Sequence, residues 1–149
     1  MPINKNNKAK LSFFKPDMES EVRIPYISQG VSAGFPSPAL DFMETAIDLN
    51  KELIENPLST FYVMVDGNSM IDVGINDKDV LVVDRSKEPQ NNKIAVCFID
   101  GEFTVKRIKF EDGTLFLMPE NKNYQPIKVT ESNQLIIWGI VTYVIKKLY

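Results

Sequence analysis

The feature that most constrains the fold is a series of short apolar runs, separated by turn signals, that begins near residue 60. Runs of this length, rich in Val, Ile and Phe, are typical of β-strands. Asp100-Gly101 and Asp112-Gly113 each lie between two such runs and favour tight hairpins, because both residue types tolerate the left-handed conformation of a type I′ turn. We predict about six to eight strands in a compact, mostly antiparallel barrel or sandwich, with the clearest strands at 61–65, 80–83, 94–99, 102–110, 114–118 and 136–145.

Two short helical segments are expected before the strands. Leu40, Met43 and Ile47 recur at helical spacing and predict a helix near residues 39–46. A second helical turn follows, with Asn50 as its expected N-cap, and Pro57 ends it.

Residues 1–33 show little periodicity, and we interpret them as an amino-terminal arm rather than a core element, with residues 34–149 as the β-rich domain. The arm holds five basic and three acidic side chains, so in a chain of net charge −3 the remainder carries −5. A body this acidic is poorly suited to bind DNA directly. A solvated tail is favoured over an arm that contacts nucleic acid.

The composition excludes several classes of chemistry. The chain has no histidine, which excludes Ser-His-Asp and Cys-His catalysis, and a single cysteine, Cys97, which leaves no plausible zinc site. We expect no metal and no cofactor. Cys97 lies in an apolar run that reads as a buried strand, and we find neither a membrane span nor a signal peptide, so the sequence favours the cytoplasm.

Ser69 is a candidate nucleophile because of the turn in which it lies. It follows Gly67 and Asn68 and precedes Met70, directly after the strand expected at 61–65. Backbone amides released at such a turn can support an oxyanion. A serine that merely satisfies the backbone of a turn has the same sequence signal.

Lys106 is a candidate general base because it lies inside a predicted strand. Period-two alternation places it on the face that carries Thr104, Ile108 and Phe110. Burial lowers the pKa of a lysine, as base catalysis near neutral pH requires. The alternative is a lysine whose stem covers apolar surface while its ammonium group reaches water.

Four segments together resemble the LexA/UmuD family of self-cleaving serine peptidases. Ser69 precedes Lys106 by 37 residues, and the segments around both residues match the family pattern. Upstream, the segment from Ala33 to Pro38 resembles the self-cleavage segment of the UmuD-like members, and the segment from Ile47 to Asn50 resembles their linker.

The resemblance implies that Ser69 is the nucleophile, Lys106 the base and Ala33-Gly34 the cleaved bond. We expect Gly67, Asn68 and Met70 to supply oxyanion or backbone support. The small side chains of Ala33 and Gly34 independently suit a bond that must enter a narrow cleft. The resemblance further implies a homodimer, stimulation by a RecA filament, and a processed form that joins a Y-family polymerase of the UmuC type in translesion synthesis.

Three other functions share some of these sequence features. A LexA-like repressor needs an amino-terminal helix-turn-helix, for which 33 mostly polar residues are too few. A signal peptidase needs a membrane anchor, which we do not find. A non-enzymatic, β-rich dimeric module that regulates a DNA polymerase or repair complex remains open. The apolar strand at 136–145 could supply its dimer face or be buried in the core.

Overall fold

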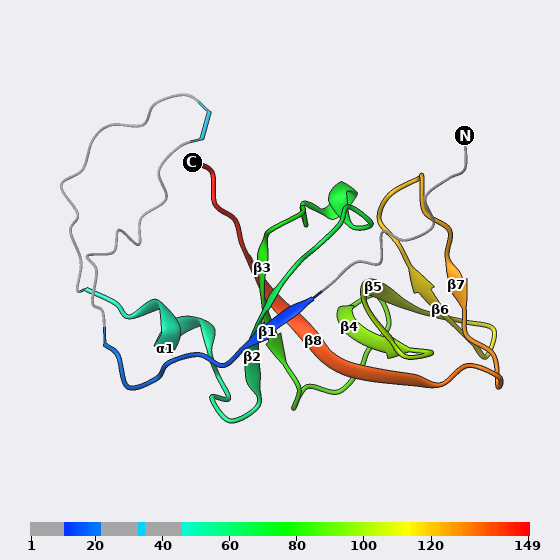
Figure 1. The fold of residues 1–149 in the computed structure, drawn as a ribbon, viewed down its shortest axis with the longest axis horizontal. Coiled ribbons are helices and arrows are strands. Elements are labelled where there is room, and N and C mark those ends of the chain that lie inside the picture. The colour runs from blue at the N-terminus through cyan, green and yellow to red at the C-terminus, as the bar shows by residue number, and fades with distance from the viewer. Residues whose placement is uncertain (1–10, 22–32, 35–45) are drawn as a thin grey trace. The chain divides into compact units, whose positions relative to one another are not determined.

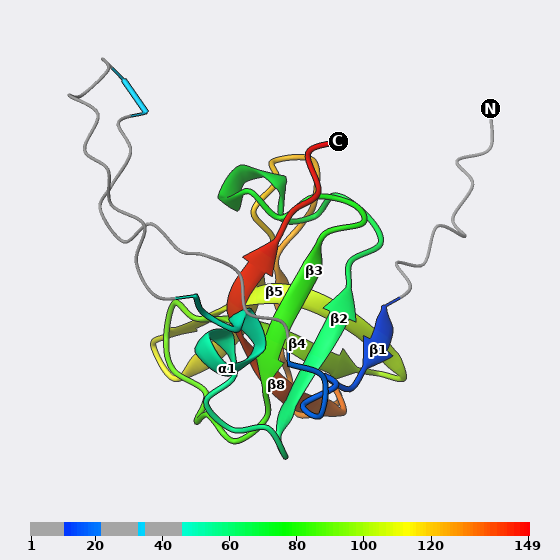
Figure 2. The same cartoon turned by 90° about the vertical axis from the view of Figure 1, so that its left-hand side faces the viewer.

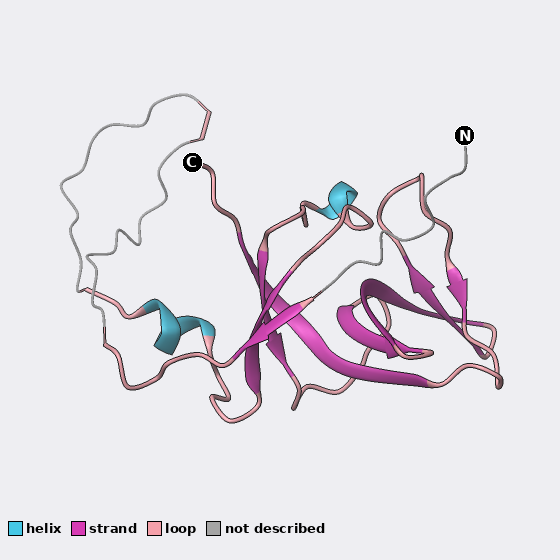
Figure 3. Cartoon of the chain, in the orientation of Figure 1, coloured by secondary structure: helices cyan, strands magenta, loops and turns pink. Residues whose placement is uncertain are grey.

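The computed structural model describes residues 11–21, 33–34 and 46–149, which fall into two units. One unit comprises residues 1–16 and 56–149, and the other comprises residues 17–55. Strands dominate the described residues, as Figure 3 shows. In sequence order they are β1 Ser12–Phe14, β2 Thr60–Met64, β3 Val80–Asp84, β4 Ile94–Ile99, β5 Glu102–Glu111, β6 Thr114–Met118, β7 Ile127–Lys128 and β8 Leu135–Ile145.

All eight strands belong to one antiparallel sheet in the order β1-β2-β3-β8-β4-β5-β6-β7 (Figure 1). The long strand β8 joins its two halves, because it pairs with β4 through residues 135–140 and with β3 through residues 140–145. Both pairings contain a register shift, which increases the local bend of a sheet. The prediction of a compact, mostly antiparallel β fold is therefore confirmed.

The two predicted hairpins have the expected backbone. At the β4–β5 turn φ is 49° for Asp100 and 84° for Gly101, and at the β5–β6 turn it is 48° for Asp112 and 74° for Gly113. Positive φ at both central residues is the requirement of a type I′ turn. These turns fix the register of β5, which pairs Lys106 with Ala95 on β4.

Two clusters of buried side chains form the core. The first packs beneath the segment that follows β2 and consists of Val63, Val65, Met70, Ile75, Leu81, Val83, Val96 and Val105. The second lies between β4, β5, β6 and β8 and consists of Ala95, Cys97, Ile99, Ile108, Leu117 and Ile140. Burial of Cys97 confirms the strand prediction for that segment.

Several local predictions differ from the structure. Ser12–Phe14 was expected to be part of an arm without core contacts, but it forms β1 beside β2 (Figure 2), because Phe13 packs on the first core cluster. The short strand β7 and the 3-10 helix Ile71–Val73 were not expected.

The helix that was expected to start after Asn50 is α1, Leu49–Leu53. Its N-cap is Asp48, whose carboxylate accepts a hydrogen bond from the Asn50 amide. The helix predicted near residues 39–46 lies outside the described residues, apart from its last position. No helix in the described ranges has the length and apolarity needed to cross a bilayer.

Asp84, at the end of β3, is a buried carboxylate that ties the entry of β2 to the sheet. Its side chain is 3% exposed and accepts hydrogen bonds from Asn56 (2.9 Å), Ser59 (2.9 Å) and the amide and hydroxyl of Ser86 (2.8 and 2.7 Å). Burial alone would raise the pKa of Asp84, but these hydrogen bonds outweigh burial and lower the pKa from 3.8 to about 2.

We predict that Asp84 makes the stability of the protein sensitive to acid. Because its pKa is lower in the folded than in the unfolded chain, its contribution is complete above about pH 4 and is lost as the pH falls toward 2. Asp84→Asn should reduce the free energy of unfolding at pH 7 by roughly 1–3 kcal/mol and should lose less on acidification than the parent. Urea denaturation at pH 7 and pH 3 measures both effects. Asp112→Asn, in an exposed turn, is the matched control, and equal acid losses in parent and Asp84→Asn would contradict the prediction.

Candidate active site

The turn that carries Ser69 is held from one side by the segment that precedes β3. The Val65 amide donates to the carbonyl of Asp79 and the Lys78 amide donates to the carbonyl of Val65, both at 2.8 Å. Gly67 has a φ of 112°, a value that only glycine adopts readily, and its amide donates to Asp77 Oδ1 at 2.8 Å. The Gly67 amide therefore supports the turn, which is one of the two roles expected for it.

The other side of the turn is held by the segment between β6 and β7. Asn121 is 9% exposed and donates from Nδ2 to the carbonyl of Asn68 at 2.8 Å. The Glu120 amide donates to the carbonyl of Ser69, also at 2.8 Å. Arg107 on β5 in turn donates to the Glu120 carboxylate at 2.5 Å. Two backbone carbonyls beside the candidate nucleophile are thus fixed by neighbours about fifty residues away in the chain.

Lys106 reaches the same point from the middle of β5. Its side chain is 6% exposed, and its Nζ lies 3.0 Å from Ser69 Oγ, 2.6 Å from Thr104 Oγ1 and 3.1 Å from the carbonyl oxygen of Val105. The contact with Thr104 agrees with the predicted alternation, which placed both side chains on one face. Ser69 and Lys106, which the sequence singled out separately, are therefore hydrogen-bonded to each other.

The environment of Lys106 favours its neutral form. Burial lowers the pKa of Lys106 from 10.5 to about 8, and the only opposing influence is the nearby Cys97. Burial also raises the pKa of the Cys97 thiol to about 12. A thiol with that pKa is uncharged near pH 8 and attracts an ammonium group only weakly. Desolvation is therefore the cause that governs the pKa of Lys106.

The three contacts of Lys106 Nζ are all with oxygen atoms, and they suit both an ammonium group and a neutral amine. An ammonium group donates three hydrogen bonds, whereas a neutral amine donates two and keeps one lone pair. The Val105 carbonyl can only accept, and Thr104 Oγ1 can accept the second N–H. When Lys106 is neutral, its lone pair is left for Ser69, whose hydroxyl can then donate to Nζ across the same 3.0 Å contact. This is the arrangement that a general base requires.

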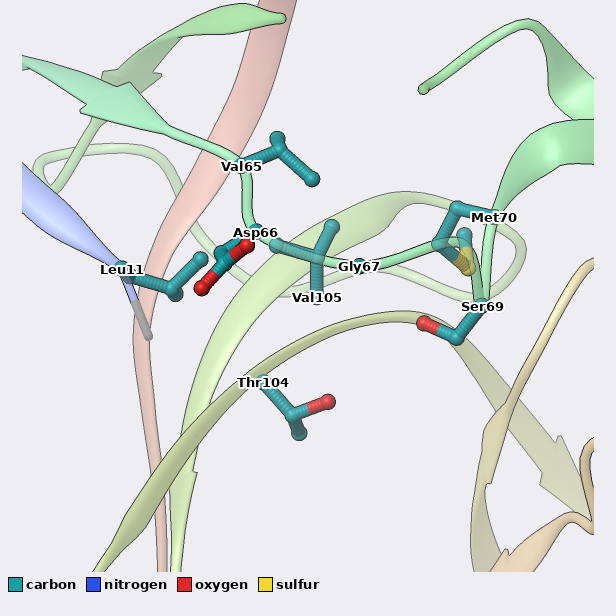
Figure 4. A pocket seen from close by; sticks show the side chains of 8 residues that line it. All are labelled: Leu11, Val65, Asp66, Gly67, Ser69, Met70, Thr104 and Val105. Carbon is teal, nitrogen blue, oxygen red and sulfur yellow. The ribbon is translucent and has the colours of Figure 1, made fainter. Parts of the chain in front are cut away.

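A pocket opens beside this pair, as Figure 4 shows. The hydroxyl groups of Ser69 and Thr104 point into the space between them, and Leu11 lies at the opposite end of the pocket from Ser69 in this view. Its lining residues are Leu11, Val65, Asp66, Gly67, Ser69, Met70, Thr104 and Val105. Met70 is 2% exposed and belongs to the core, so its side chain anchors the turn.

The remaining predicted site residues are Ala33 and Gly34, which belong to the unit of residues 17–55. Both are exposed, and a Cβ added to Gly34 would meet no atom within 4 Å. Cleavage between them stays a prediction. Sequence reasoning did not find Asp77 or Asn121, because a polar residue in a loop gives no signal of the distant carbonyl or amide that it will contact.

Comparisons with known proteins show the family of the chain. The family described as Peptidase S24-like matches residues 25–142. Protein MucA of Salmonella typhimurium is 39% identical over 136 residues, which are 90% of this chain and 92% of MucA. Protein ImpA of Escherichia coli is 39% identical over 129 residues, 87% of each chain. The LexA repressor of Alcanivorax borkumensis is 36% identical over 126 residues, 85% of this chain and 60% of the repressor. The chain therefore belongs to the Peptidase S24-like family of serine peptidases, as a UmuD-like relative of LexA.

Proposed function

We propose that this protein cleaves its own Ala33-Gly34 bond, with Ser69 as nucleophile and Lys106 as general base. The observation that carries the proposal is the 3.0 Å contact between Lys106 Nζ and Ser69 Oγ at a lysine that is 6% exposed. A buried lysine next to a serine on a pocket wall is the arrangement of Ser/Lys peptidases. Family membership supports the same chemistry.

In the first step neutral Lys106 removes the proton from the Ser69 hydroxyl as Oγ attacks the carbonyl carbon of Ala33. The negative charge that develops on the Ala33 oxygen needs backbone donors. The Gly67 amide already donates to Asp77, so we assign this role to the amides of Asn68 and of Ser69, which lines the pocket.

Collapse of the intermediate breaks the bond between the Ala33 carbonyl carbon and the Gly34 nitrogen. The proton held by Lys106 passes to that nitrogen, so Gly34 leaves as a free amine and residues 1–33 stay esterified to Ser69. Lys106, neutral again, deprotonates a water that hydrolyses the ester. The products are residues 1–33 with a new carboxylate and residues 34–149, and Ser69 is regenerated.

The biological setting follows from the relatives. The chain is similar along most of its length to MucA, ImpA and SamA, which are UmuD-like proteins. We propose that it acts in the cytoplasm as a homodimer, that a RecA filament on single-stranded DNA stimulates its cleavage, and that residues 34–149 serve a UmuC-like Y-family polymerase in SOS mutagenesis. Because substrate and nucleophile share one chain, their local concentration is high and cleavage is limited by presentation of the bond and by protonation of Lys106.

The first prediction about cleavage tests the dyad. Ser69→Ala and Lys106→Ala should each abolish cleavage, because one removes the nucleophile and the other the base. Intact-mass spectrometry of the purified protein, alone and with RecA filaments, should detect fragments of residues 1–33 and 34–149 only in the parent. Lys109→Ala, a lysine on the same strand paired with Glu111 at the surface, is the control and should cleave normally. An uncut parent with RecA filaments would favour a non-enzymatic interaction module.

The second prediction concerns pH. Since the base must be neutral and the pKa of Lys106 is about 8, the cleavage rate should rise roughly tenfold per pH unit below 8 and level off above it. Rates measured from pH 6 to pH 10 by gel densitometry give the profile. A rate that is independent of pH across this range would contradict base catalysis by Lys106.

The third prediction concerns the hydrogen bond from Asn121 to the Asn68 carbonyl. Asn121→Ala should slow cleavage roughly 10- to 100-fold, because a small displacement of the nucleophile is costly. The pH midpoint should stay at that of the parent, because the surroundings of Lys106 do not change. Asn123→Ala is the matched control, since only its backbone amide contacts Asn121. A shifted midpoint, or equal loss in the control, would argue against this positioning role.

A further inference from the structure

Strand β1 covers one edge of the sheet with residues that precede the proposed cleavage site. It pairs antiparallel with β2 through Ser12 and Met64, Phe13 and Val63, and Phe14 and Tyr62. Beyond β1 the sheet has no further strand among the described residues. The edge of β2 is therefore satisfied by only three residues of the amino-terminal segment.

The side chain of Phe13 packs among aromatic rings. We call the site that it occupies the Phe13 groove and define it by Phe61, Phe103 and Trp138. The ring centroid of Phe13 lies 4.8 Å from that of Phe103 and 4.8 Å from that of Trp138. Phe61 closes the groove with its own contact to Trp138 at 5.0 Å. Tilted and edge-on contacts of this kind are each worth about 0.5–1.5 kcal/mol beyond the area they bury.

Lys15 adds a polar contact next to the groove. Its Nζ lies 4.4 Å above the centre of the Phe61 ring and donates to the carbonyl of Leu58 at 3.1 Å. Phe14, between Phe13 and Lys15, is 53% exposed and faces away. The edge thus takes an extended segment that has an aromatic side chain and, two residues later, a basic one.

We propose that the edge of β2 and the Phe13 groove form a docking site for an extended segment of a partner protein, with an aromatic residue followed two positions later by Lys or Arg. This inference rests on the proposed function, because release of residues 1–33 would remove β1. An open strand edge next to an apolar groove binds a further strand readily, through main-chain hydrogen bonds and one side-chain anchor.

A foreign partner fits this site better than a second processed copy. Every processed copy lacks residues 11–15, so no processed copy can supply the segment that occupies the Phe13 groove in the intact chain. The body without residues 1–33 carries a net charge of −5, which favours a basic residue at the position of Lys15. We therefore assign the site to a partner and treat self-association as a result that would overturn the assignment.

The test uses the full chain with Ser69→Ala, so that no cleavage intervenes. Adding Phe13→Asp releases β1, because a carboxylate is costly among aromatic rings. The probe is a synthetic peptide of residues 9–17, and the signal is the fluorescence of Trp138, the only tryptophan in the chain. We call the chain with both Ser69→Ala and Phe13→Asp the released chain. Its fluorescence change should saturate, and half of the change should occur at a peptide concentration roughly tenfold lower than for the chain with Ser69→Ala alone, in which the tethered β1 competes with the peptide.

Matched peptides identify the anchor. A peptide with Phe13→Ala should bind roughly tenfold more weakly, whereas a peptide with Phe14→Ala should bind like the parent. A chain with Phe13→Ala, which only truncates the ring, repeats the titration in case Phe13→Asp unfolds the protein. Three results would each overturn the proposal. The first is that the two altered peptides bind equally well, and the second is that neither chain that carries a Phe13 substitution responds to the peptide. The third is that light scattering detects larger assemblies of the released chain.

The titration and the cleavage assay fail independently. A negative titration with normal cleavage of the parent overturns the docking site alone. A positive titration with a parent that never cleaves overturns the proposed function and leaves a groove that only displacement of β1 can open.

Discussion

The contact between the buried amine of Lys106 and the hydroxyl of Ser69 is the interaction on which the rest of the arrangement depends. An amine can act as a base near neutral pH only if it is desolvated, and it stays buried only if its remaining hydrogen bonds are satisfied. Thr104 and the Val105 carbonyl meet this second condition from within β5 itself. Because β5 pairs with strands on both sides, the position of the base is set by the middle of the sheet rather than by a loop.

Ser69 lies in a turn and not in a strand, so contacts with other segments must fix its position. Met70 packs into the core, Asp77 holds the Gly67 amide, and Asn121 and Glu120 hold the neighbouring carbonyls. These contacts come from both sides of the turn, which a single hairpin could not achieve. The turn is therefore held in place although it forms neither a regular helix nor a strand.

The sequence predicted the parts of this structure that local rules govern. The strands β4 and β6 and both Asp-Gly hairpins have the predicted bounds, because alternation and turn chemistry act within a few residues. Strand β1 was missed because three residues in a polar segment carry almost no periodicity, and its partner lies fifty residues away. The N-cap shifted from Asn50 to Asp48 because both residue types suit the position and only three-dimensional contacts decide between them. Each of Ser69 and Lys106 alone fits an ordinary structural role. The absence of histidine favoured pairing them, because Ser/Lys dyads can replace the triad, and the family resemblance supported the pair.

The edges of the sheet connect the fold to the proposed processing. Both edge strands are very short, three residues in β1 and two in β7, and short edges discourage unwanted pairing with other chains. If β1 left, the five-residue strand β2 would become the edge, and it would pair with a further strand more readily than the short strands β1 and β7 do. In the intact chain β1 is tethered, so even a weak interaction keeps it in place through a high local concentration. Cutting the chain after Ala33 would remove that tether without altering any contact of β1. Hydrolysis of one peptide bond outside the strands of the sheet would thus be sufficient to turn a protected edge into an available one.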